Sequence, residues 1–317
     1  MSRVVRGGWR VNATDAPGAP LVSVVIPTYN HARVLGRALA SVVAQTVRDW
    51  EAIVVNNHST DDTRAVVERI GDPRIGFVDY ANHGVIAASR NEGIRRARGR
   101  YVAFLDSDDE WMPEKLEACL ALMHPEVGLV GHGELWRDAA GHDRPMVYGP
   151  ADRTTYDALL WRGNCISTSA VVVRTDALRA VGGFDEDPAI VTTEDYDLWL
   201  RLAHAGVRMA FTPRMLGVFH RHPDSMSSAA DRHLRAELAL LARHFGAGPA
   251  AATTRLRRRH RIARAHYGAG RQLRREPAAA LRAFATALAI SPFTWRAYPA
   301  AAIAVGDALR RARGGRA

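Results

Sequence analysis

The sequence has few of the residues that mark disulfide-stabilised, zinc-binding or membrane-spanning proteins. Its 2 cysteines, Cys119 and Cys165, stand far apart and form no CxxC pair. We therefore expect free, reduced thiols and a cytoplasmic protein. No uninterrupted apolar run approaches the ~20 residues that cross a bilayer, and no apolar segment follows the N-terminal arginines. We expect neither a membrane span nor a signal peptide.

Lysine is almost absent, and the positive charge is unevenly distributed. Lys115 is the only lysine among 43 basic residues, so the abundance of arginine says little about guanidinium chemistry. The formal net charge is +10. Residues 231–317 hold 18 arginines and 4 acidic residues, whereas residues 1–230 hold 25 basic and 29 acidic residues. The excess belongs to the C-terminal region. No groove-reading motif accompanies it, and we expect no nucleic-acid partner.

The chain contains a regular alternation of apolar strands and amphipathic helices. Strand and helix alternate four times, which predicts an α/β fold with a mostly parallel sheet flanked by helices. The four strands are "LVSVVIPTYN", "WEAIVVNN", "RIGFVDY" and "YVAFLD". Ser59, Thr60 and Asp61 are N-cap candidates for the helix after the second strand.

After residue 110 the alternation loosens. We expect a helix in "WMPEKLEACLALM", a strand in "VGLVGHGELWRD", a loop in "GHDRPMVYGP", an amphipathic helix in "EDYDLWLRLAHAG", and one or two strands in "VRMAFTPRMLGVFHRH". From about Ala229 the composition changes to alanine, leucine and arginine, which predicts an all-helical region. Three parts are therefore predicted: a lead-in over 1–20, an α/β domain over 21–228 and a basic helical region over 229–317.

Three polar loops are expected at one edge of the sheet, because ligands of such sheets gather at the carboxyl ends of the strands. The loops are "PTYN", "NNHSTDD" and "DSDDE". The last one places Asp106, Asp108, Asp109 and Glu110 together. Like charges this close resist ionisation unless a positive partner lies among them. The alternative is that these acids stabilise the N-terminus of the helix that follows.

These stretches, taken in order, resemble the family 2 glycosyltransferases of the GT-A fold. The resemblance runs from Val22 to about Ser227 and includes "SVVIPTYN", "VVNNHSTDDT", "GVIAASRNEGIRRARGRYVAFLDSDDEW", "NCISTSAVVVR", "VGGFDE", "EDYDLWLRLA" and "HRHPDSMS". It implies an inverting, metal-dependent enzyme. Such an enzyme moves a sugar from a nucleotide-sugar donor to an acceptor hydroxyl, here in cell-surface polysaccharide or glycolipid biosynthesis.

The resemblance implies a DxD-type metal site at Asp106, Ser107 and Asp108. Asp108 would bind Mn²⁺ or Mg²⁺ directly, while Asp106 would reach the ribose or the metal through water. His222 corresponds to a histidine that lies near the diphosphate or the metal in relatives. A role in binding phosphate and a role as a metal ligand stay open for it.

The general base implied by the resemblance is Asp195, which follows Glu194 at the start of a helix. It would take the proton of the acceptor hydroxyl, and single displacement would invert the anomeric centre. Capping of the helix by the same acidic residues is the structural alternative, and the two roles are compatible.

The nucleotide would lie on the first two polar loops. Pro27, Thr28 and Asn30 correspond to residues under the base and ribose in relatives. Where the family commonly has "DDGS", with an acidic acceptor for the uracil N3–H, this chain has Asn56 and Asn57. Asparagine still offers a carbonyl acceptor and adds donors, so UDP-, dTDP- and GDP-linked donors all stay open.

Other polar and aromatic residues are candidates for the same neighbourhood. Arg90 matches an arginine near the nucleotide or its phosphates, with a solvated helix surface as the alternative. Trp111, Trp136 and Trp199 could stack on an acceptor sugar, although tryptophan at such positions is more often core. Polar groups beside the acceptor are expected at Asn164 and over 167–169.

The basic region allows docking to an anionic inner leaflet, where lipid-linked acceptors reside, or a solvated helical appendage. Two other functions stay open for the whole chain. A nucleotidyltransferase would need a glycine-rich, lysine-bearing phosphate loop, which "PTYNHAR" lacks. A catalytically inert relative would act as a basic scaffold or binding protein.

Overall fold

The computed structural model describes residues 18–221, 230–246 and 251–314, with side chains up to Arg310. The described chain forms two compact units. One comprises residues 18–159, 163–186 and 194–221, and the other comprises 160–162, 187–193 and the described residues from Ala230 onward.

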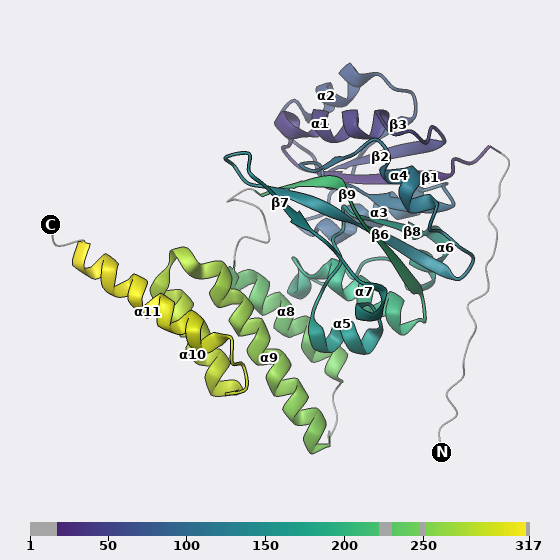
Figure 1. The fold of residues 1–317 in the computed structure, drawn as a ribbon. Coiled ribbons are helices and arrows are strands. Elements are labelled where there is room, and N and C mark those ends of the chain that lie inside the picture. Colours follow the sequence, from purple (N-terminus) through teal and green to yellow (C-terminus); the bar gives the residue numbers. More distant parts are fainter. Residues whose placement is uncertain (1–17, 222–229, 247–250, 315–317) are drawn as a thin grey trace, which may run out of the picture. The chain divides into compact units, whose positions relative to one another are not determined.

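A mixed nine-stranded sheet is the centre of the first unit (Figure 1). Its order is β3-β2-β1-β4-β8-β6-β9-β5, and β7 pairs with β6. The four strands predicted from the alternation run parallel, while β8 pairs antiparallel with β4 and β6 antiparallel with β8. The strands are β1 (Val22–Thr28), β2 (Trp50–Asn56), β3 (Ile75–Asp79), β4 (Tyr101–Phe104), β5 (Glu110–Trp111), β6 (Val127–Arg137), β7 (Asp143–Met146), β8 (Val171–Arg174) and β9 (Arg208–His220).

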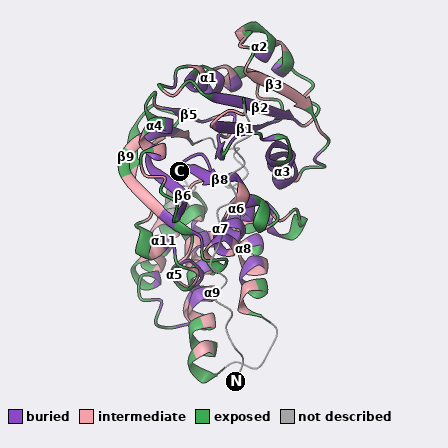
Figure 2. Ribbon diagram, turned by 90° about the vertical axis from the view of Figure 1, so that its right-hand side faces the viewer, coloured by how far each residue is buried: buried purple, intermediate pink, exposed green. Residues whose placement is uncertain are grey.

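Helices and short 3₁₀ turns connect these strands. Those of the first unit are α1 (Ala32–Val43), α2 (Thr63–Ile70), α3 (Ile86–Arg96), α4 (Lys115–Leu120), η1 (Ala151–Arg153), α6 (Thr175–Ala180) and α7 (Glu194–His204). Helix α5 (Tyr156–Arg162) has residues in both units, and η2 (Pro188–Ile190) belongs to the second. Strands β1, β2 and β8 are buried over their whole length (Figure 2), which their nearly continuous β-branched sequences predict.

Alternation along β1 buries this strand on two sides. Val24 and Ile26 belong to the same buried cluster as Leu39 of α1. Val25 points to the opposite face, where α3 crosses so closely that a Cβ on Gly93 would lie 2.3 Å from a methyl carbon of Val25. This close packing fixes α3, and with it Arg90, against the central strand.

Two details of the sequence prediction are wrong. Strand β7 lies inside the stretch predicted to be a loop, because its residues pair with β6 although they lack an apolar alternation. Helix α2 begins after Asp62, beyond the N-cap candidates. The carboxylate of Asp61 instead accepts hydrogen bonds from the backbone N–H groups of Ala32 and Thr63, at 2.9 and 3.1 Å, and so joins two loops.

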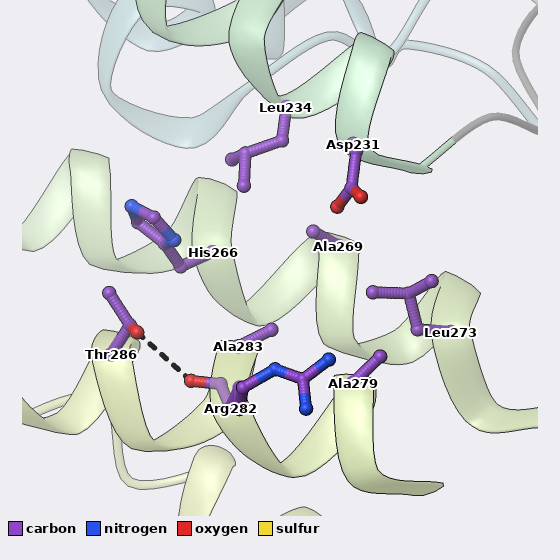
Figure 3. Close-up of a pocket in the computed structure, with 9 residues that line it drawn as sticks. All are labelled: Asp231, Leu234, His266, Ala269, Leu273, Ala279, Arg282, Ala283 and Thr286. Atoms are coloured by element: carbon purple, nitrogen blue, oxygen red, sulfur yellow. Dashed lines mark hydrogen bonds between the residues drawn. The ribbon is translucent and has the colours of Figure 1, made fainter. Parts of the chain in front are cut away.

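The second unit confirms the predicted all-helical region. Its long helices are α8 (Ala230–Phe245), α9 (Ala252–Gln272), α10 (Pro277–Ile290) and α11 (Ala297–Gly314), with the 3₁₀ turn η4 (Leu273–Arg275). Phe284 of α10 is buried against Ala304 of α11 and Tyr267 of α9. A small cavity of about 220 Å³ lies between α8, α9 and α10 (Figure 3). None of the described helices has the length and apolarity that crossing a bilayer requires.

Candidate active site

A tight acidic turn follows β4 at the carboxyl edge of the sheet. The backbone N–H of Asp109 donates to the carbonyl of Asp106 at 3.0 Å, which closes the turn. Ser169 supports it from the start of β8, because its hydroxyl accepts from the Asp106 N–H at 3.1 Å and donates to the Asp109 carboxylate at 2.6 Å. Asp106 and Asp108 are half-buried, whereas Ser107 and Asp109 are buried.

Asp109 has a structural position within this turn. Its carboxylate also accepts the backbone N–H of His220 at 3.1 Å, which ties the turn to the end of β9. Burial and the neighbouring charges of Asp108, Glu134 and Asp106 raise the pKa of Asp109 well above its usual range. The turn therefore concentrates negative charge around Asp109.

Arg90 is a cation that faces this turn, and it is buried rather than at the helix surface. Its guanidinium donates to Asp106 at 2.8 Å and to Glu194 at 2.7 Å. Burial opposes ionisation, but the attraction of the two carboxylates outweighs it and raises the pKa of Arg90. One charged group thus connects the acidic turn with the first residue of α7.

Asp195 lies beside this connection, at the second position of α7. Its carboxylate accepts the backbone N–H of Tyr196 at 2.7 Å and has longer contacts with Thr168 at 3.4 Å and Asn164 at 3.5 Å. Burial, reinforced by the charge of Glu194, raises the pKa of Asp195 to about 7. A carboxylate of this basicity can accept a proton near neutral pH.

The loops after β1 and β2 are joined by Asn30. Its backbone N–H donates to Ser59 Oγ, and its side-chain oxygen accepts from the Thr60 N–H, both at 2.8 Å. Asn30, His58 and His83 have left-handed backbones and lie one in each loop after β1, β2 and β3. Non-glycine residues adopt this conformation only where the surroundings enforce it, so the three loops form a constrained edge.

Pro27 and Thr28 end β1 beneath this edge, and both are buried. The hydroxyl of Thr28 is buried without a hydrogen-bond partner among the described residues. Since buried hydroxyl groups normally have a partner, this one is open to a ligand at the end of β1.

The two asparagines predicted to read the base are already engaged. Asn56 donates to Asp79 at 2.7 Å, while its carbonyl accepts the Ser59 N–H at 3.2 Å and the Ser59 hydroxyl at 2.5 Å. The carbonyl of Asn57 accepts from the backbone of Asn82 at 2.9 Å. The side-chain NH₂ group of Asn57 makes no hydrogen bond with any described residue, so it is a donor that a ligand could use.

The donor set at the acidic turn fits a divalent cation. Asp106 and Asp108 supply hard carboxylate oxygens, and the crowding around Asp109 favours an added positive charge. Within 18–221 and the described helical residues, no group of three or more His, Cys, Asp or Glu side chains is arranged to hold a metal. A cation here would therefore need water or substrate oxygens as further ligands. His222 lies outside the described residues.

Of the three tryptophans considered as stacking platforms for a sugar, two are buried in the core. Trp199 is fully buried and Trp111 is 4% exposed, so neither can stack on a sugar. Trp136 keeps a partly open face, and its indole N–H donates to Tyr148 at 2.9 Å. Tyr148 in turn donates to Glu134 at 2.8 Å. The sequence does not predict this hydrogen-bonded group, because Tyr148 lies in a segment without apolar periodicity.

A buried group of titratable side chains lies under the acidic turn. Burial raises the pKa of Glu134 to about 7 and lowers that of Lys115 to about 7 and that of His132 to about 3. Lys115 donates to the carbonyl of Val171 at 3.2 Å and lies 3.5 Å above the Trp111 ring. No pattern around Lys115 predicts that the only lysine of the chain lies in the core.

Other residues of the edge were missed by sequence reasoning. Asp79 ends β3 beside Asn56, and the rule that ligands gather at strand ends could have found it. The His31 ring nitrogen Nδ1 lies 2.7 Å from the hydroxyl of Ser107, a pairing of residues 76 positions apart that no local pattern indicates.

The chain is similar to known proteins in both sequence and structure. The family model described as Glycosyl transferase family 2 matches residues 23–182. WfgD of Escherichia coli, a UDP-Glc:alpha-D-GlcNAc-diphosphoundecaprenol beta-1,3-glucosyltransferase, is 38% identical over 182 residues, which are 57% of this chain and 69% of WfgD.

Solved structures of similar fold include a bacterial and an archaeal protein. S. aureus TarS 1–349 in complex with UDP-GlcNAc has a TM-score of 0.62 at 18% identity, covering 85% of this chain and 81% of that one. The mannosyltransferase PcManGT from Pyrobaculum calidifontis, in complex with GDP-Man and Mn²⁺, has a TM-score of 0.59 at 24% identity, covering 96% and 84%.

Proposed function

The chain belongs to glycosyl transferase family 2 and is a glycosyltransferase of the GT-A fold, and from that premise we propose that it transfers a sugar with inversion from a nucleotide-sugar donor to an acceptor hydroxyl. The acceptor we propose is a saccharide, carried on a lipid as in the name of WfgD, in cell-surface polysaccharide or glycolipid biosynthesis. The observation that carries the proposal is the Arg90 guanidinium, which joins the acidic turn to the helix of Asp195.

The proposed reaction is a single displacement at the anomeric carbon. The acceptor oxygen forms the new bond to that carbon as the bond to the diphosphate oxygen breaks, and the nucleoside diphosphate leaves with the electron pair. The proton of the acceptor hydroxyl passes to the Asp195 carboxylate, whose pKa of about 7 suits it to this transfer. No covalent enzyme intermediate is required.

The remaining residues bind and orient. Asp108 and Asp106 would hold Mn²⁺ or Mg²⁺, which when bound neutralises charge on the leaving diphosphate. Arg90 fixes Asp106 and Glu194 in place. Pro27, Thr28 and the NH₂ of Asn57 line the edge that we propose for the nucleoside.

Titration calorimetry with UDP, dTDP and GDP, each with and without Mn²⁺, tests this assignment. We expect one nucleotide to bind, and only with the metal. Asp108→Ala should abolish that metal-dependent binding, while Asp152→Ala, on the exposed turn η1, should leave it unchanged. Metal-independent binding of equal strength in Asp108→Ala would remove the DxD assignment. Failure of every nucleotide to bind would favour an inert relative acting as a basic scaffold.

We also propose that the protein is cytoplasmic and that its basic helical region contacts the membrane surface without spanning it.

A further inference from the structure

Exposed large apolar side chains are concentrated near the end of the described chain. Nine such residues occur in the part of the chain that the structure describes, and six of them lie within 293–309. Phe293 is 78% exposed and Trp295 is 67% exposed. Single exposed apolar residues are ordinary on protein surfaces, but a concentration of this kind marks an interaction site.

Part of this group forms one face of α11. Tyr298, Val305 and Leu309 follow one another at spacings of seven and four, which places them on the same side of a helix, and all three are exposed. Another side of α11 packs on α10, where Ala304 is buried against Phe284. Helix α11 therefore packs on α10 through alanines such as Ala304, while the larger apolar side chains of Tyr298, Val305 and Leu309 stay exposed within the part of the chain that the structure describes.

The aromatic residues lie in the connection that leads from α10 into α11. Phe293 and Trp295 extend from this short connection, which Ser291 and Thr294 hold together through a backbone hydrogen bond of 3.1 Å. We use the name aromatic patch for Phe293, Trp295, Tyr298, Val305 and Leu309.

Arginines surround the aromatic patch. The guanidinium of Arg296 lies 5.1 Å from the Trp295 ring centroid. Arg259 of α9 donates to the carbonyl of Ile290 at 3.2 Å, directly before the connection. Residues 251–310 contain 12 arginines and 2 acidic residues, and one of these two, Asp307, is paired with Arg310.

We propose that the aromatic patch inserts into the interface of an anionic lipid bilayer while the surrounding arginines bind the lipid head groups. Tryptophan, tyrosine and phenylalanine favour the boundary between head groups and acyl chains. Arginines near an anionic surface are attracted to it, and the attraction grows with their number. A second copy of this chain is a poorer occupant, because its own patch would bring a second group of arginines against the first. A nucleic acid would leave the aliphatic stripe of α11 exposed.

This inference rests on the proposed function for its purpose, since a lipid-linked acceptor is found at such a surface. Its test does not. Vesicle binding is measured without any nucleotide, and nucleotide binding is measured without vesicles, so the proposed membrane docking and the proposed sugar transfer can each fail while the other holds.

The test is co-sedimentation of the full chain with vesicles of phosphatidylcholine alone and with vesicles that also contain about 30% of the anionic lipid phosphatidylglycerol. The chain should bind the anionic vesicles only, and binding should weaken as salt rises. The double variant Phe293→Ser, Trp295→Ser should lower the partition coefficient by about tenfold or more. Val147→Ser removes another exposed apolar side chain, 61% exposed, from the first unit and should bind like the wild type.

Two further measurements keep the result decisive. Circular dichroism melting of the double variant checks that α10 and α11 remain folded, and quenching by brominated lipid should fall in Trp295→Phe if that ring enters the bilayer. Unchanged sedimentation of the double variant would overturn the proposal. So would light scattering that finds a wild-type dimer which the double variant converts to a monomer.

Discussion

At the scale of single residues, the environment of each carboxylate separates its role from that of its neighbours. Asp109 is buried and bonded to Ser169 and His220, so it holds the turn. Asp106 is paired with Arg90. Asp195 has no ion pair among the contacts described above, and its raised pKa leaves it able to accept a proton.

This difference predicts the pH dependence of turnover. A base must be deprotonated to act, and Asp195 with a pKa of about 7 is protonated below that pH. We therefore expect kcat to rise about tenfold for each pH unit below 7 and to level off above it. Steady-state rates between pH 5.5 and 8.5 measure this profile.

Asp195→Asn should lower turnover by roughly 10²–10⁴-fold while leaving donor binding nearly intact. The control is Glu68→Gln, on the exposed side of α2, which should keep the wild-type profile. A flat profile in the wild-type enzyme, or wild-type rates in Asp195→Asn, would contradict the role of Asp195.

The sequence could identify these carboxylates but not their surroundings. Motif order led to Asp106, Asp108 and Asp195. It could not decide whether Arg90 was buried, because a helix of mixed composition does not show which face meets the sheet. The engagement of the Asn56 carbonyl by Ser59 depends on loop conformation, which no short-range pattern determines.

At the scale of elements, the close crossing of α3 over β1 positions the site. Gly93 permits it, because any Cβ there would overlap Val25. The alternating strands and helices of this half could be predicted, since each carries its own periodic signal. Strand β7 could not, because it is held by pairing with β6 and not by a pattern of its own.

A matched pair of glycine substitutions tests this crossing. Gly93→Ala places a methyl group 2.3 Å from Val25 and should reduce the free energy of unfolding by about 1–3 kcal/mol. Gly36→Ala in α1 meets Val66 at an ordinary 3.6 Å and should increase it by about 0.5–1 kcal/mol. Urea unfolding of both variants measures the difference. Equal effects would show that the crossing is loose.

At the scale of the whole molecule, the chain is two units with different means of stabilisation. The first has a large sheet core, whereas the second relies on small apolar contacts and on arginine. Arg261, buried in the second unit, donates to the carbonyl of Leu160 at 2.9 Å and to Glu237 at 2.6 Å. The sequence showed the change of composition near residue 229, but not that 160–162 and 187–193 would group with the helices.

Scanning calorimetry should therefore resolve two transitions. A nucleotide with Mn²⁺ should raise the transition temperature of the first unit. At a nucleotide concentration of 100 times Kd, its free energy of unfolding should increase by about 2.7 kcal/mol. Arg261→Met leaves Glu237 without its buried partner. The substitution should lower the free energy of unfolding of the second unit by about 3–5 kcal/mol, and its transition temperature with it.

Arg310→Met, which breaks an exposed pair with Asp307, is the control and should change little. A single transition that shifts equally with nucleotide and with Arg261→Met would show that the units unfold as one.

The burial of Lys115 has a practical consequence for handling this protein. Because the only lysine of the chain is fully enclosed, reagents and enzymes that modify lysine side chains find none on the folded surface. Acetylation, crosslinking or tryptic cleavage at Lys115 would require the core around it to open. A lysine adduct found in a sample therefore shows that the core opened in those molecules, and modification of Lys115 can be used to measure unfolding.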